Sequence, residues 1–292
     1  MSLYLGCPLW SYKPWLGSFY PEGTKQSQFL REYAHRLTTV EGNTTFYAVP
    51  NEEILARWAA EMPETFRFCP KLPRTISHAG ELQPHIQEAH AFIQVMRQLG
   101  PRLGPMFLQL PPRYAPNLLE DLGAFLKAWP ALVPLAVEVR HPAWFTSPHQ
   151  EHLLGLLEGL GKAQVLIDTR PIRSLSGNKI LAGSVYQQML VTRDPQADRP
   201  ISTSQEGGFI FLRFIGHPLL EQNDAFIEEW AEHLAGALAQ GREAYVFCHC
   251  PDERLDPWLC REFHQRVNAR FTLPSLPWDE IDAHLARQSR LL

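Results

Sequence analysis

Residues 135–140, LAVEVR, contain the pattern that predicts the fold of this chain. Apolar residues alternate there with Glu138 and Arg140, as in a strand with one apolar face. Eight short β-branched or aromatic runs of this kind occur, at residues 3–6, 39–43, 66–71, 105–110, 135–140, 164–168, 209–214 and 244–249. Amphipathic segments with helical spacing lie among them, at residues 27–37, 52–61, 84–99, 118–129, 149–160, 224–240 and 257–269. Alternating strands and helices predict a parallel α/β sheet, and eight strands is the number that closes a barrel.

The chain of 292 residues is expected to form one domain, a single (β/α)₈ barrel of the TIM type over residues 1–292. A doubly wound sheet of the Rossmann type is the main alternative. Against it, the first strand leads into GCPLWSYKPW, residues 6–15, instead of a glycine-rich phosphate loop. Residues 170–208 predict a long loop after the sixth strand that could act as a lid, and residues 276–292 predict an extra C-terminal helix.

Charge and cysteine content limit the class of protein. The 27 Lys and Arg against 31 Asp and Glu give a formal charge of -4, so no overall basic field draws the chain to nucleic acid. The sequence has no membrane-spanning apolar run and no signal peptide at its start. Five cysteines, an odd and sparse number, indicate reduced thiols. We therefore expect a cytoplasmic protein that has no membrane partner and for which nucleic acid is a disfavoured partner. Any attraction for anions must come from a local group of charges. The oligomeric state is not predicted.

Polar side chains near the C-terminal ends of the predicted strands indicate a functional site. In a parallel barrel, alternate side chains face the lumen, and those at the C-terminal ends line the mouth where ligands bind. In residues 135–140 the apolar side chains suit the helix-facing side, which turns Glu138 and Arg140 inward. The same argument brings to the mouth Glu41, Asn43, Lys71, Gln109, Asp168, Arg213 and His249.

This set predicts an enzyme, a hydrolase or lyase, that acts on a small phosphorylated or carboxylated compound. Arg140, Arg213 and Lys71 would hold the anion, because a guanidinium fork contacts such groups through two hydrogen bonds. Glu138 or Asp168 would serve as general acid or base. Further candidates are Glu41 and His249 for catalysis, and Gln109, Asn43, His141 and Trp10 for substrate binding.

Some of these candidates have a structural explanation as well. His141 and His78 follow strand ends and could act as acid or base near neutral pH. His141 also precedes Pro142, however, and could simply orient the turn HPAWF at residues 141–145. The first loop carries aromatic side chains that could stack on a flat ligand, although packing is the favoured role; they are Trp10, Trp15, Phe19 and Tyr20.

Metal sites and paired carboxylates give further alternatives. A divalent ion, Mg²⁺ or Mn²⁺, could be held by Glu41, Glu138, Asp168 and His249, although the nearby arginines make it electrostatically less necessary. A zinc site could be built from Cys248, His249, Cys250, Cys260 and His264. Against zinc, Cys248 and Cys250 would point away from His249 in a continuing strand, and no CxxC pair is present. Paired carboxylates are also compatible with a glycosidase.

Two interpretations without catalysis stay open. The barrel could capture a metabolite or the end of a nucleic acid without turnover, which a basic mouth and the loop aromatics would suit. Alternatively, the charged groups could form an ion-pair network that stabilises the barrel, with the function residing in a surface partner. The members of that network would be Glu138, Arg140, Asp168 and Arg213.

Five blocks of sequence resemble the YecE-like family, catalogued as domain of unknown function 72. They are GCPLWSYKPWLGSFYP, VEGNTTFY, FRFCPKLPRTISH, LQLPPRY and AVEVRHPAWF, which occur in this order and begin at residues 6, 40, 66, 108 and 136. The resemblance implies a TIM-barrel-like fold and an intracellular bacterial or archaeal protein, but it implies no reaction. It marks as motif positions Glu41, Asn43, Thr45, Tyr47, Lys71, Arg74, Gln109, Glu138, Arg140, His141, Trp144 and Asp168.

The sequence departs from the pattern of this family at three strand ends. Pro8 and Leu9 replace the small pair in the usual GCSGW motif. The seventh strand lacks the common Arg-x-His ending and has Ile215 where the histidine would stand. Residues 248–250, CHC, stand where asparagines are common. These departures imply a variant ligand or a loss of activity.

Overall fold

The computed structural model describes residues 2–173 and 208–288. Its strands are β1 (Leu3–Gly6), β2 (Thr39–Gly42), β3 (Arg67–Pro70), β4 (Met106–Gln109), β5 (Leu135–Glu138), β6 (Ala163–Asp168), β7 (Phe209–Ile215) and β8 (Glu243–His249). Its α-helices are α1 (Phe29–Ala34), α2 (Thr44–Tyr47), α3 (Glu52–Glu61), α4 (Arg74–Ser77), α5 (Ile86–Met96), α6 (Leu119–Ala128), α7 (His149–Gly159), α8 (Arg170–Arg173), α10 (Asp224–Ala239), α11 (Asp256–Asn268) and α12 (Pro277–Gln288). Most of the predicted lid at residues 170–208 lies outside the described residues, apart from its first residues, which form α8.

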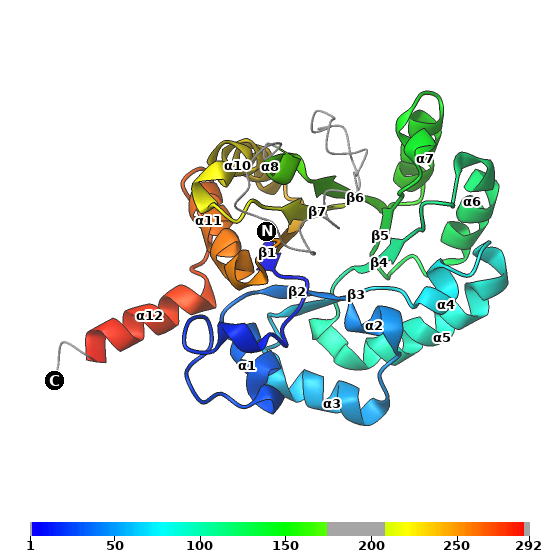
Figure 1. Cartoon of the computed structure of the whole chain (residues 1–292). Helices are drawn as coiled ribbons and strands as arrows, with labels where there is room; N and C mark the ends of the chain where they lie inside the picture. Colours follow the sequence, from blue (N-terminus) through cyan, green and yellow to red (C-terminus); the bar gives the residue numbers. More distant parts are fainter. Residues whose placement is uncertain (1, 174–207, 289–292) are drawn as a thin grey trace.

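The described strands pair in parallel and the larger helices lie around their outer side (Figure 1). Six strands form one sheet in the order β1-β8-β7-β6-β5-β4, and β2 pairs with β3. The register places Gln109 beside Glu138 on neighbouring strands, and Ile215 beside His249. The predicted α/β fold is therefore confirmed, with the C-terminal ends of its strands at one end of the molecule.

The two sheets are joined by isolated backbone hydrogen bonds and not by ladders. The amide of Glu41 donates to the carbonyl of Cys7 at 3.1 Å, and the amide of Leu72 donates to the carbonyl of Phe107 at 3.0 Å. Gly6 permits a close approach of β1 and β2, since a Cβ there would lie 2.0 Å from the carbonyl oxygen of Thr39. The arrangement is barrel-like, but its ladder of hydrogen bonds is interrupted at two positions, a feature that the sequence pattern did not predict.

Two apolar layers lie on opposite sides of the strands. Phe107, Phe211 and Phe247 fill the inner side, with ring centroids 5.3 Å apart for the first pair and 4.8 Å for the second. The outer layer packs against the helices and includes Leu108 and Val137. Successive side chains of a strand face opposite sides. Polar residues two positions further along the same strands as the inner aromatic residues therefore also face the inner side, next to this apolar layer.

The predicted C-terminal helix is confirmed as α12, which extends away from the rest of the chain (Figure 1). Trp278 anchors its start, with its ring 5.0 Å from that of Phe19 and 5.3 Å from that of Trp258. The guanidinium of Arg261 lies 4.2 Å from the centroid of the Trp278 ring. Within residues 2–173 and 208–288, no helix combines the length and the apolar character that a membrane span requires.

Candidate functional site

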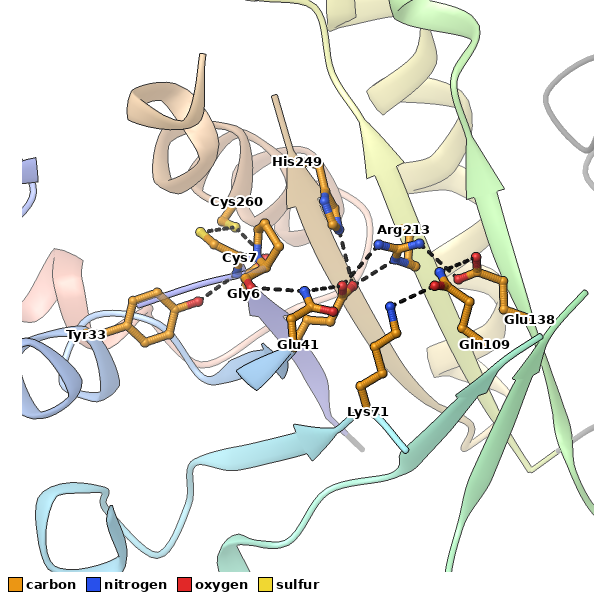
Figure 2. Close-up of polar contacts among 12 residues, drawn as sticks. Gly6, Cys7, Tyr33, Glu41, Lys71, Gln109, Glu138, Arg213, His249 and Cys260 are labelled. Atoms are coloured by element: carbon orange, nitrogen blue, oxygen red, sulfur yellow. Dashed lines mark hydrogen bonds and ion pairs between the residues drawn. The ribbon is translucent and has the colours of Figure 1, made fainter. Parts of the chain in front are cut away.

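Two buried glutamates, Glu41 and Glu138, share one arginine at the C-terminal ends of the strands (Figure 2). Arg213 donates from Nε to Glu41 Oε2 at 2.8 Å and from Nη2 to Glu41 Oε1 at 3.1 Å. Its remaining terminal nitrogen, Nη1, donates to Glu138 Oε2 at 2.9 Å. Both glutamates are 0% exposed. Arg213 of β7 therefore ties β2 to β5 across the inside of the fold.

A chain of hydrogen bonds leads from Glu138 to Lys71. Gln109 Nε2 donates to Glu138 Oε1 at 2.6 Å, and Lys71 Nζ donates to Gln109 Oε1 at 2.7 Å. The two neighbours fix the orientation of this amide, because a carboxylate only accepts and an ammonium only donates. Gln109 thus links the amine of Lys71 to the carboxylate of Glu138 (Figure 2).

Glu41 has two further neighbours. Asn43 Nδ2 donates to Glu41 Oε1 at 2.7 Å and lies 3.1 Å from the carbonyl oxygen of Pro8. His249 Nε2 lies 3.2 Å from Glu41 Oε2, a distance at which a ring N–H donates to the carboxylate. These contacts fill the hydrogen-bonding capacity of Glu41. We call Glu41, Asn43, Lys71, Gln109, Glu138, Arg140, Arg213 and His249 the mouth cluster.

Arg140 is more exposed than Arg213, the other arginine of the mouth cluster, and is held by fewer contacts. Its Nε lies 3.7 Å from Glu138 Oε1, beyond hydrogen-bond distance, and its side chain is 25% exposed. The side chain of Arg213 is only 13% exposed. Within the described part of the chain, the Arg140 guanidinium makes no hydrogen bond. Arg140 is therefore the arginine of the cluster that is best placed to meet a ligand.

The mouth cluster carries a net positive charge. Three cations, Lys71, Arg140 and Arg213, face two carboxylates, even with His249 neutral. Burial alone would raise the pKa of Glu41, but the charges of Arg213 and His249 hold it well below its usual range. Burial, together with the charge of Arg213, lowers the pKa of Lys71 to about 8. The cluster therefore contains a firmly ionised carboxylate and an amine that gives up its proton readily.

The comparison with known families gives a match over almost the whole chain. The sequence model described as "Protein of unknown function DUF72" matches residues 4–280. The chain belongs to the DUF72 family. The UPF0759 protein YecE of Escherichia coli K12 is 32% identical over 278 residues, which cover 94% of this chain and 95% of YecE. The UPF0759 protein YunF of Bacillus subtilis is 25% identical over 256 residues, with coverage of 84% and 87%.

Solved DUF72 structures have the same fold. A DUF72 family protein from Enterococcus faecalis superposes with a TM-score of 0.67 at 19% identity, over 94% of this chain and 97% of that one. Another, from Thermotoga maritima, gives 0.66 at 20% identity, over 92% and 100%. At these identities the likeness concerns the fold alone.

Residues at the three strand ends where departures from the family pattern were expected lie in or next to the mouth cluster of this DUF72 chain. The carbonyl of Pro8 accepts the Asn43 amide. Ile215 belongs to the inner apolar layer and stands beside His249 in the register. His249 itself contacts Glu41.

Asp168 does not join the mouth cluster, and this corrects the prediction that it lines the mouth. Its Oδ2 accepts from Arg170 Nη2 at 2.7 Å and from Trp230 Nε1 at 2.8 Å. Val165 and Ile167 belong to the inner layer, so the alternation of β6 turns Asp168 towards α10. The carboxylate is part of the packing between strand and helix.

His141 and Trp10 make their contacts outside the mouth cluster. His141 Nδ1 accepts from the amide of Ala143 at 3.1 Å, so it caps the short helix at Pro142–Phe145. The ring of Trp10 packs edge-on against the rings of Trp58 and Phe68, with centroids 5.5 and 5.6 Å apart. The other aromatic side chains of the first loop are buried in the outer apolar layer; they are Trp15, Phe19 and Tyr20.

Neither metal arrangement is assembled among the described residues, where no group of three or more His, Cys, Asp or Glu side chains is placed to hold an ion. Arg213 bonds to both Glu41 and Glu138, the carboxylates proposed for Mg²⁺ or Mn²⁺. His249 faces Glu41, whereas Cys248 is buried in the outer layer with Cys260. His264 contacts the carbonyl of Pro274 through Nε2 at 2.8 Å.

Two aromatic side chains of the site were missed by the sequence argument. Lys71 Nζ lies 4.4 Å from the ring centroid of Phe46 and 5.6 Å from that of Phe107. Phe107 shares the phase of Gln109 on β4, so strand alternation could have placed it on the inner side. Phe46 lies in α2, directly after β2, and only the fold brings it over Lys71.

The ionised state of Glu41 predicts a measurable acid sensitivity. Its pKa is depressed in the folded chain, so its contribution to stability is present above the unfolded pKa of about 4.3 and is lost as the pH falls below it. We expect the free energy of unfolding of the native chain to fall about 1.4 kcal/mol per pH unit more steeply below pH 4 than that of Glu41→Gln. Urea unfolding at several pH values measures both slopes; equal slopes would contradict the assignment.

Proposed function

We propose that this DUF72 protein is an enzyme, a hydrolase or lyase, that acts on a small phosphorylated or carboxylated compound at the mouth cluster. One observation carries the proposal: three cations face two carboxylates in a largely buried cluster, and one of the cations, Arg140, has a partly exposed guanidinium without a hydrogen bond among the described residues. Uncompensated charge away from water is costly, and a bound anion would offset it.

The contacts support different roles for the cations. Arg140 and Lys71 have hydrogen-bond donors left for an anion, because in the part of the chain that the structure describes Arg140 uses none and Lys71 uses one, to Gln109. Arg213 was predicted to hold the anion as well, yet it directs its donors to Glu41 and Glu138. We assign it to positioning these carboxylates.

Proton transfer is assigned to Glu138, with His249 as the second carrier. Glu138 lies in the same hydrogen-bonded chain as Lys71, and it is next to Arg140. His249 contacts Glu41 through Nε2 at 3.2 Å, and an imidazole can carry a proton between two partners. Asp168 takes no part in this proposal, because its carboxylate faces α10.

Incubation of the pure protein with a mixture of phosphorylated and carboxylated metabolites, with and without Mg²⁺ or Mn²⁺, tests this function. Mass spectrometry should detect loss of one compound and gain of its product, and Glu138→Gln should abolish the change. Glu64→Gln is the matched control, since the side chain of Glu64 is 76% exposed. If the protein retained a compound but formed no product, the proposal of an enzyme would be contradicted, and a binding or sensing protein would be favoured.

A second candidate role is stabilisation, and it is favoured by the contacts of Arg213. This guanidinium makes three hydrogen bonds to two fully buried carboxylates, as a structural ion-pair network would. On this account Arg140 contributes nothing to ligand binding, and the variant Arg140→Ala discussed below separates the two roles.

A further inference from the structure

We propose that Lys71 is a nucleophilic amine that forms a Schiff base with a small aldehyde or ketone bearing a carboxylate or phosphate group. The inference rests on the proposed anion site and names the substrate class of that site. It is carried by the position of Lys71 Nζ, which lies beside two aromatic rings and bonds to a neutral amide where a carboxylate would be usual.

Among the described residues, Lys71 has no ion pair of the kind that normally accompanies a buried lysine. The residue is 8% exposed, and its amine donates to Gln109 Oε1. In residues 2–173 and 208–288, no carboxylate lies within salt-bridge distance of it. Phe46 and Phe107 exclude water from the amine, which favours its neutral form, while their ring faces attract the ammonium, which opposes it. Burial makes a lysine lose its proton more easily than one in solvent, and a neutral amine is the nucleophile.

The charged groups around Lys71 come from several elements. Glu41 on β2 and Glu138 on β5 favour the ammonium, whereas Arg213 on β7 and Arg140 after β5 oppose it. His78, after α4, is influenced by Lys71 in turn, and its pKa is lowered by burial and by this ammonium. Burial and Arg213 prevail at Lys71, so that a substantial fraction of the amine is neutral near pH 8.

The chemical step balances without any further reactant. The neutral amine attacks the carbonyl carbon, the carbon–nitrogen bond forms, and the π electrons of the carbonyl move to its oxygen. Two protons pass from the nitrogen to that oxygen, the carbon–oxygen bond breaks, and water leaves. The product is the imine of Lys71, which is ready to take up a proton and become an iminium.

An iminium at Lys71 would explain why the amine and the carboxylate are linked. It attracts electrons from a bond at the adjacent carbon of the substrate, which is the requirement of a lyase. Arg140 would hold the anionic group of the substrate, and Glu138, joined to Lys71 through Gln109, would exchange the proton.

Trapping with borohydride tests the inference on the full chain at pH 8. Glyoxylate is the anionic probe and acetaldehyde the uncharged one; borohydride delivers hydride to the imine carbon and makes the adduct permanent. Peptide mapping by mass spectrometry should find the glyoxylate adduct at Lys71. We expect Arg140→Ala to lower the glyoxylate adduct about tenfold, as for the loss of one charge-assisted hydrogen bond. The acetaldehyde adduct should fall less, because it loses no anion contact and responds only to the stronger preference of Lys71 for its ammonium form.

Lys162 provides the matched control. It is also buried, at 4% exposure, and burial lowers its pKa, but it lies just before β6, at the opposite end of the strands. Lys162→Met should keep the Lys71 adduct, and Lys71→Met should remove it from a folded chain. Glyoxylate adducts at Lys162 and at the exposed Lys127, with no adduct at Lys71, would overturn the inference. Binding of inorganic phosphate then separates the two proposals. If Lys71 forms no adduct but phosphate binds and Arg140→Ala weakens that binding, the anion site stands without the Schiff base. If phosphate does not bind in this way either, the anion site and the Schiff base are both contradicted.

Discussion

Replacement of Arg213 by methionine is expected to lower the free energy of unfolding by about 3–5 kcal/mol. The substitution keeps an unbranched apolar stem but leaves Glu41 and Glu138, both fully buried, without the cation that joins them. Two buried carboxylates that have lost the arginine between them must then be protonated or hydrated, and either change costs stability. Urea unfolding of both proteins at pH 7 measures the difference.

The control for this prediction is an arginine on the surface. Arg261 pairs with Asp279 and Asp282 and has a side chain 24% exposed, so Arg261→Met should cost about 1 kcal/mol or less. Addition of Glu41→Gln to Arg213→Met should recover part of the loss, because it removes one of the unpaired charges. A loss below about 1 kcal/mol for Arg213→Met would mean that water already reaches these carboxylates.

Arg140→Ala is expected to weaken the binding of inorganic phosphate about tenfold to a hundredfold, the range for losing a hydrogen bond to a charged group. The loss of stability should be small, because Glu138 keeps its bonds to Arg213 and Gln109. Titration calorimetry at low ionic strength measures the affinity, and urea unfolding measures the stability. The opposite pattern, an unchanged affinity and a large loss of stability, would favour the purely structural role of the cluster.

Arg97→Ala is the matched control for phosphate binding. Arg97 is exposed and begins the short helix Arg97–Arg102 that precedes β4, so it lies near the opposite end of the strands from the mouth cluster. Its removal changes the net charge by the same amount. An equal loss of affinity in the two variants would show that phosphate responds to overall charge and not to a site.

Strand alternation predicted most of the mouth cluster because the phase of several strands is unambiguous. In β5 the apolar Leu135 and Val137 share one side, which leaves Glu138 only the other. In β6 the residues before Asp168 are Val165, Leu166 and Ile167, apolar on both sides. The sequence therefore does not define the phase of β6, and the prediction for Asp168 was wrong for this reason.

Other features of the site depend on contacts that no local pattern encodes. Arg140 and Arg213 are equivalent cations in the sequence, yet one is partly exposed and the other is enclosed by two glutamates. The position of Phe46 over Lys71 depends on how α2 follows β2. The close approach of β1 and β2 at Gly6 depends on how the two backbones pack. Such features follow from packing and not from composition or periodicity.

A crystal structure of the protein grown or soaked with sulfate at neutral pH would test the anion site most directly. The account predicts a sulfate ion at the mouth cluster, within hydrogen-bond distance of the Arg140 guanidinium and of Lys71 Nζ, with the bonds of Arg213 to Glu41 and Glu138 intact. Sulfate bound elsewhere on the molecule, with this mouth filled only by water, would contradict it.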